Sequence, residues 1–142
     1  MLLYHYTAID FLDSILEHGL NRGLVVMTPR STGINAVWLT TDPNPAGHGL
    51  TDDRQLTPDE RELIYQIEGN RLSPGAKFAN KRAIRLTVKL HSKDRALRKW
   101  SSWSVKRIEP SWLTTLNDTG VGSSGWQART CDLLPGNVTT LR

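Results

Sequence analysis

The chain has 142 residues, of which 38% are hydrophobic and 23% are charged, and its formal net charge is +4. This length and balance indicate one globular domain over residues 1–142 and exclude a disordered chain. Cys131 is the single cysteine, which excludes an intramolecular disulfide and a cysteine-rich zinc site. Neither a membrane span nor a signal-peptide pattern occurs, so we expect a cytoplasmic protein without membrane contact.

The first part of the chain predicts a strand followed by a helix. Residues 2–7 are β-prone, and their alternation places His5 and Thr7 on one face. A histidine in the middle of a strand makes His5 a candidate functional residue. A helix is expected from residue 8, with Thr7 as its N-cap and Gly19 at its end. The apolar positions at helical spacing are Ile9, Leu12, Ile15 and Leu16.

A second strand and a second helix are predicted next. Residues 36–40 form a short β-prone segment, which the prolines and glycines that follow bring to an end. Thr57 then begins a helix as its N-cap, with Pro58 at the first helical position and Glu60 reaching back to the cap. A strand over residues 63–67 is the alternative, and the capping pattern favours the helix.

The second half of the chain predicts mostly strands. Residues 83–90 alternate strictly between apolar and other side chains, which is typical of a strand with one buried face. A short helix is expected over residues 92–100, followed by strands at 103–108, 112–116 and 126–133. These elements indicate an α+β domain with a largely antiparallel sheet and one or two helices after the first strands.

A basic run extends from residue 77 to residue 107. It holds eleven lysines and arginines against one acid, Asp94. Such a run could follow a phosphate backbone while its tryptophans stack on bases. A solvated basic face is the alternative. The candidate nucleic-acid-binding residues are Lys81, Arg82, Arg98, Lys99, Trp100 and Trp103.

Three short segments occur in an order that identifies a resemblance. They are Leu3-Tyr4-His5-Tyr6-Thr7, Glu17-His18-Gly19-Leu20 and Val37-Trp38-Leu39-Thr40-Thr41. Together they resemble the opening of small ADP-ribosyltransferase-fold proteins, including DarT-type DNA ADP-ribosyltransferases and RNA 2′-phosphotransferases. The strand over residues 82–90 and the segment Ile108-Glu109-Pro110-Ser111-Trp112-Leu113 extend the similarity across most of the chain. The resemblance implies a split β-sheet core with NAD in the cleft between two small sheets.

The resemblance also implies roles for individual residues. His5 is the expected ribose ligand and one of two catalytic candidates, the other being Glu109. An imidazole can hold ribose hydroxyls, an aromatic face attracts cationic nicotinamide, and a carboxylate stabilises an oxocarbenium-like transition state. No metal is expected, because the histidines lack metal-ligand spacing. The residues expected to bind NAD are His5, Tyr6, Thr7, Trp38, Thr40 and Arg85.

The position of the carboxylate departs from the family pattern. In DarT-like proteins the catalytic glutamate precedes the closing segment, whereas residues 101–104 contain no acid. Glu109 and Glu68 are the substitutes that the sequence offers. The expected function is transfer of ADP-ribose from NAD to a nucleic acid or protein acceptor. The alternative is a non-catalytic binding or inhibitor protein that uses the basic, tryptophan-containing segment to hold nucleic acid or a nucleic-acid-binding partner.

Overall fold

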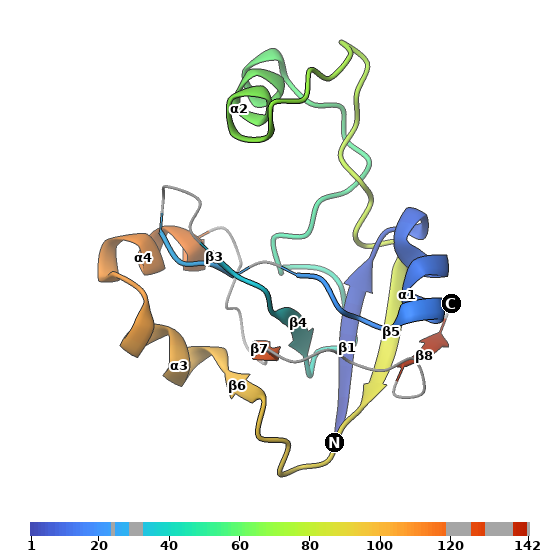
Figure 1. Ribbon diagram of the computed structural model, residues 1–142, viewed down its shortest axis with the longest axis vertical. Helices are drawn as coiled ribbons and strands as arrows, with labels where there is room; N and C mark the ends of the chain where they lie inside the picture. Colours follow the sequence, from blue (N-terminus) through green and yellow to red (C-terminus); the bar gives the residue numbers. More distant parts are fainter. Residues whose placement is uncertain (24, 29–32, 119–125, 130–137, 142) are drawn as a thin grey trace.

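An antiparallel sheet of six strands forms the centre of the protein (Figure 1), in the order β6-β7-β4-β1-β5-β8. The computed structural model describes residues 1–23, 25–28, 33–118, 126–129 and 138–141. The sheet strands are β1 (Leu2–Thr7), β4 (Val37–Thr40), β5 (Ile84–Lys89), β6 (Leu97–Lys99), β7 (Trp126–Arg129) and β8 (Val138–Leu141). A separate hairpin pairs β2 (Val25–Val26) with β3 (Gly33–Ile34). The predicted mixture of helices with an antiparallel sheet is confirmed.

The sheet consists of two halves that meet at one point. β1 and β5 pair over six residues of each strand, from Leu2↔Lys89 to Thr7↔Ile84. β4 and β7 pair over four residues of each strand. Between the halves, β1 and β4 share the single register pair Tyr4↔Thr40. The halves β6-β7-β4 and β1-β5-β8 therefore share a single register pair, and β1 and β4 lie at their junction.

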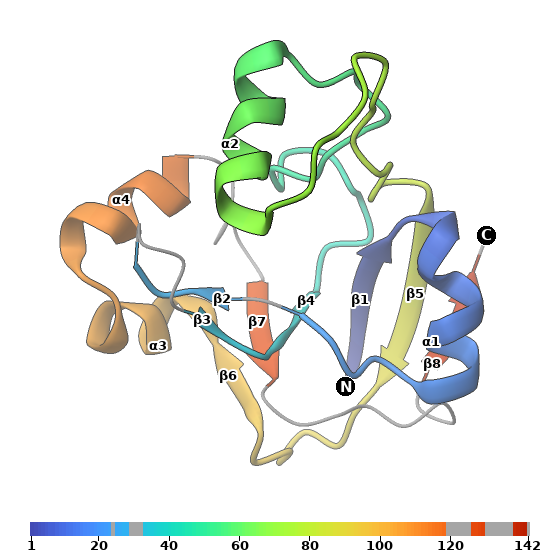
Figure 2. The same ribbon diagram turned by 45° about the horizontal axis from the view of Figure 1, so that its top comes forward.

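The first core cluster lies between β1, β5 and helix α1 (Leu12–His18), which covers this face of the sheet (Figure 2). The buried face predicted for residues 83–90 is confirmed, since each of its apolar side chains is buried. These side chains are Ile84, Leu86, Val88 and Leu90. Leu3 from β1 and Leu12 from α1 pack against them.

The start of the first helix differs from the prediction. Residues Ile9–Phe11 form a 3-10 turn, η1, and neither η1 nor α1 has a side-chain cap, so the prediction of Thr7 as N-cap was wrong. The tighter turn rotates Ile9 off the α-helical stripe. Ile9 is 66% exposed and Leu16 is 45% exposed. The predicted apolar stripe is thus reduced to its two buried members, Leu12 and Ile15.

The region after β6 is helical where strands were predicted. Helices α3 (Trp100–Arg107) and α4 (Pro110–Asp118) replace the strands expected at residues 103–108 and 112–116, and residues 92–96 form turns in place of a helix. Trp100, Ser104 and Ile108 are buried at a spacing of four residues, a helical period. They belong to a tryptophan-rich stretch whose β-propensity favours strands. Of the strand predicted at residues 126–133, β7 confirms 126–129, and residues 130–133 lie outside the described part.

Trp100 and Ile108 belong to a second core cluster beneath the other half of the sheet. Its buried members also include Val25 and Ala36, which come from β2 and from the residue preceding β4. Partly buried side chains pack around these four. They are Met27, Ile34, Trp38, Trp103, Trp112, Leu113 and Leu116. Strand β4 contributes to both cores, because Val37 and Leu39 belong to the first cluster and Trp38 packs against the second.

An arm formed by residues 51–81 connects the two halves and carries helix α2 (Pro58–Glu68), which projects away from the sheet (Figures 1 and 2). The predicted capping box of Thr57 and Glu60 is confirmed, with Pro58 at the helix start and Gly69 in the left-handed conformation at its end. Among the described side chains of α2, none is buried. No helix in the described ranges combines the length and apolar character needed to cross a membrane.

Candidate functional site

A cavity of about 860 Å³ opens beside the junction of the two sheet halves. Its walls come from β1, α1, residues 19–23 after α1, Trp38 of β4, residues 48–51, and Lys81 at the end of the arm. This volume falls within the range of small-molecule sites, about 300–1,000 Å³. The cavity is therefore large enough for a nucleotide.

His5 links the two halves of the sheet at the wall of this cavity. Its Nδ1 lies 2.9 Å from the backbone oxygen of Trp38. Because a carbonyl oxygen can only accept, Nδ1 donates and carries the proton. Desolvation by the surrounding protein lowers the pKa of His5, the hydrogen bond to Trp38 partly opposes this effect, and the positive charge of Lys81 adds to it. Nε2 of the neutral ring thus has a lone pair that can accept from a ligand hydroxyl.

The lowered pKa of His5 predicts a pH effect on stability. Below the ordinary value of 6.5, the unfolded chain takes up a proton that the folded protein resists, so stability falls as pH decreases. We expect the thermal midpoint to fall between about pH 7.5 and about pH 5.5, and to fall less in His5→Gln. Calorimetry of wild type and His5→Gln at both pH values measures this difference. Equal losses in wild type and His5→Gln would contradict it.

The charged side chains of the cavity are cationic. Arg22 and Lys81 line it together with the imidazoles of His5, His18 and His48, and none of its described lining residues is an aspartate or glutamate. A low-dielectric wall with charges of one sign attracts a ligand of the opposite sign. The cavity is therefore suited to an anion.

Phe11 adds an aromatic surface to this wall. It belongs to η1, lines the cavity, and is 49% exposed, so its ring is accessible to a ligand. An aromatic face can stack on a planar base or attract a cationic ring. Combined with the cationic side chains of Arg22 and Lys81, it gives the cavity groups for both parts of a nucleotide.

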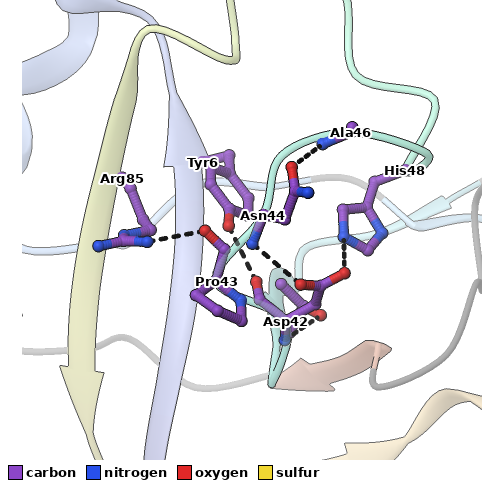
Figure 3. Close-up of polar contacts among 8 residues, drawn as sticks. Tyr6, Asp42, Pro43, Asn44, Ala46, His48 and Arg85 are labelled. Atoms are coloured by element: carbon purple, nitrogen blue, oxygen red, sulfur yellow. Dashed lines mark hydrogen bonds and ion pairs between the residues drawn. The ribbon is translucent and has the colours of Figure 1, made fainter.

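Polar contacts hold the segment after β4 against β1 and β5 (Figure 3). The hydroxyl of Tyr6 donates to the backbone oxygen of Asp42 at 2.9 Å, and the guanidinium of Arg85 donates to the backbone oxygen of Pro43 at 2.7 Å. His48 Nε2 lies 3.1 Å from Asp42 Oδ2, and its ring stacks on Tyr6. Burial raises the pKa of Tyr6, which keeps its hydroxyl protonated. These contacts position residues 48–51 as a wall of the cavity.

The predicted NAD-binding residues divide into two groups. His5, Tyr6, Thr7 and Trp38 line the cavity. Thr40 and Arg85 are not among its lining residues: the Thr40 hydroxyl accepts from the Asp42 amide at 3.1 Å, and Arg85 stacks over Tyr4 at 5.1 Å. Since Arg85 pairs with Tyr6 across the strands, its side chain lies on the face opposite to His5. Thr40 and Arg85 therefore support the segment after β4.

The carboxylates suggested by the sequence lie away from the cavity. Glu109 is exposed beside the start of α4, where its Oε1 accepts from the Ser111 hydroxyl at 2.8 Å. Glu68 is exposed at the end of α2. Neither residue lines the cavity. Asp42 does not line the cavity either: its carboxylate contacts His48 and its backbone oxygen accepts from Tyr6, and both of these residues do line it.

The predicted nucleic-acid-binding residues are also separated by the fold. Trp100 is 2% exposed, and its ring lies 4.7 Å from that of Trp38, so the prediction that it stacks on bases was wrong. Trp103 is half-buried against Trp100. Lys81 lines the cavity. Lys81 is also exposed, as are Arg82 beside the arm and Arg98 and Lys99 on the edge strand β6.

The cavity residues that sequence reasoning missed include Phe11, Arg22, His18 and His48. Phe11 had a signal, because it is a large aromatic side chain that lies outside the apolar stripe predicted for the first helix. The others stand in loops or at a helix end. Comparisons with protein-family models, with curated proteins and with solved structures found no match. Functional evidence for this chain therefore comes from its own residues.

Proposed function

We propose that the cavity binds NAD in an ADP-ribosyltransferase-like domain that transfers ADP-ribose to a macromolecular acceptor. The observation that carries this proposal is the position of His5, at the junction of two sheet halves that share a single register pair and on the wall of a cationic cavity. The single register pair between β1 and β4 is what a split-sheet core would require. A cleft at such a junction suits a ligand that contacts both halves.

Each part of NAD has a matching group in the cavity. A ribose hydroxyl donates to Nε2 of His5, which is the acceptor of the neutral ring. Arg22 and Lys81 bind the pyrophosphate through charge-assisted hydrogen bonds. Phe11 offers its face to adenine or to the cationic nicotinamide. The ring of Trp38 packs on Trp100 within the second core cluster, so Phe11 takes the aromatic role that the resemblance assigned to Trp38.

A second candidate function is nucleotide binding without transfer. The observation in its favour is that no described residue lining the cavity is an acid. Breaking the bond between nicotinamide and ribose develops positive charge on the ribose, which a carboxylate would stabilise. The cationic side chains of the cavity would bind the pyrophosphate of NAD, but they would not stabilise the positive charge of this transition state.

One experiment separates the two functions. The purified chain is titrated with NAD by calorimetry, and nicotinamide release is followed by chromatography. Binding with release supports the transferase, binding without release supports the nucleotide-binding protein, and absence of binding refutes both. His5→Ala should weaken NAD binding by about tenfold, the value of one hydrogen bond of about 1.4 kcal/mol. The control is His91→Ala, which is exposed, lies outside the cavity and should bind as wild type.

A further inference from the structure

The outward face of α2 is exposed and acidic. Asp59, Glu62, Leu63 and Gln66 are all exposed, and their spacing of three and four residues places them on one side of the helix. Leu63 is 56% exposed in the middle of this outward stripe. This face of α2 combines exposed acids with an exposed leucine and covers no core, so both kinds of side chain are accessible to a partner.

The arginines of the arm are engaged elsewhere. Arg54 pairs with Glu60 at 2.9 Å. Arg61 donates to the backbone oxygen of Pro74 at 2.6 Å. Arg71 lies over the ring of Tyr65 at 4.1 Å. Among the described residues no ion pair includes an acid of the outward stripe. The stripe therefore keeps its negative charge toward solvent.

The arm is braced by hydrogen bonds between its two sides, and its base belongs to the cavity. The amide of Lys81 donates to the backbone oxygen of Thr51, and the amide of Phe78 to that of Arg54, each at 2.9 Å. Thr51 and Lys81 also line the cavity. A partner held by α2 is thus attached to the same arm whose base forms one wall of the cavity.

We propose that the outward stripe of α2 docks a basic protein segment carrying an apolar side chain, and that this segment belongs to the acceptor. The proposal that a segment docks here is based on the charges of α2. The proposal that this segment belongs to the acceptor rests on the proposed function. Lysines or arginines of the segment pair with Asp59 and Glu62, and its apolar side chain covers Leu63. A phosphate backbone would be repelled by the same carboxylates. The exposed cations of β6 lie at the far edge of the sheet from the arm (Figure 1).

The test uses the full chain without NAD. Its result can therefore be interpreted even if the protein does not bind NAD. Fluorescence anisotropy measures binding of a labelled peptide of alternating lysine and leucine, and of single-stranded DNA of equal charge. Wild type should bind the peptide. Asp59→Lys with Glu62→Lys should weaken that binding by at least about tenfold, and Leu63→Ala should weaken it to a smaller extent.

Two further double variants serve as controls for this test. Asp59→Asn with Glu62→Gln removes the charges without placing lysine in the first turn of the helix, and should also weaken peptide binding. Asp13→Lys with Glu17→Lys on α1 makes the same change in net charge as the double reversal and should leave peptide binding within about twofold of wild type. Equal losses in the α1 and α2 reversals overturn the proposal, as does DNA binding that depends on Asp59 and Glu62.

Discussion

Under the proposed function, reversing the charges of Arg22 and Lys81 to glutamate is expected to weaken NAD binding strongly. Both cations line the cavity, and a hydrogen bond to a charged group contributes about 1.5–3 kcal/mol. Losing both contacts and adding two carboxylates that repel the pyrophosphate should weaken the affinity by at least about 100-fold. Calorimetric titration of the Arg22→Glu, Lys81→Glu double variant with NAD measures this loss.

The control for this prediction is the Lys106→Glu, Arg107→Glu variant at the end of α3. It changes the net charge by the same amount at two exposed residues outside the cavity. Its affinity for NAD should stay within about twofold of wild type. ADP-ribose should lose affinity for the cavity variant as NAD does, whereas adenosine, which has no phosphate, should not. A similar loss in both variants would indicate that net charge, and not the cavity, controls binding.

Replacing Trp100 by alanine is expected to produce the largest loss of stability. The side chain is 2% exposed, and its ring lies 4.7 Å from that of Trp38 and 6.1 Å from that of Trp103. Truncating a buried tryptophan to alanine typically costs about 3–5 kcal/mol, because apolar contacts are lost and a cavity remains. Since a domain of this kind is stable by roughly 5–15 kcal/mol, the change should be evident in urea unfolding.

Val105→Ala is the matched control on the same helix. Val105 is 62% exposed, so its truncation should change the free energy of unfolding by about 0.5 kcal/mol or less. If Trp100 were instead a surface residue that stacks on bases, Trp100→Ala would leave unfolding nearly unchanged and lower the affinity for single-stranded DNA. The burial of Trp100 favours the first result.

Elements with a strong local signal were predictable from the sequence. The capping box of Thr57 and Glu60 involves groups three residues apart, and the structure has both of its hydrogen bonds. The alternation of apolar and other side chains in β5 indicates that one face of this strand is buried, and it involves only residues of that strand. α3 and α4 were missed because tryptophans and β-branched residues favour strands when only a short stretch of sequence is considered. A helix is indicated by the packing of Trp100 and Ile108, which stand at a helical spacing, into one cluster, and this packing depends on the fold.

The candidate site was predictable only in part, because its residues come from distant parts of the chain. His5 and Trp38 were expected to lie together, and the hydrogen bond between them confirms that they do. Arg22 and Lys81 are far apart in sequence, and the position of Lys81 depends on the pairing of the two sides of the arm. The ADP-ribosyltransferase-like core stays a prediction, which the NAD titration tests.

The sequence by itself determined where β1, β4, β5 and α2 form and that His5 stands in the middle of a strand, because neighbouring residues control these features. Only the tertiary structure decided what surrounds His5. It placed cations in the cavity wall, left Glu109 exposed near α4, and buried Trp100 in a core. The physical reason is that burial and electrostatic environment arise from contacts between segments far apart in the chain, which no local pattern contains.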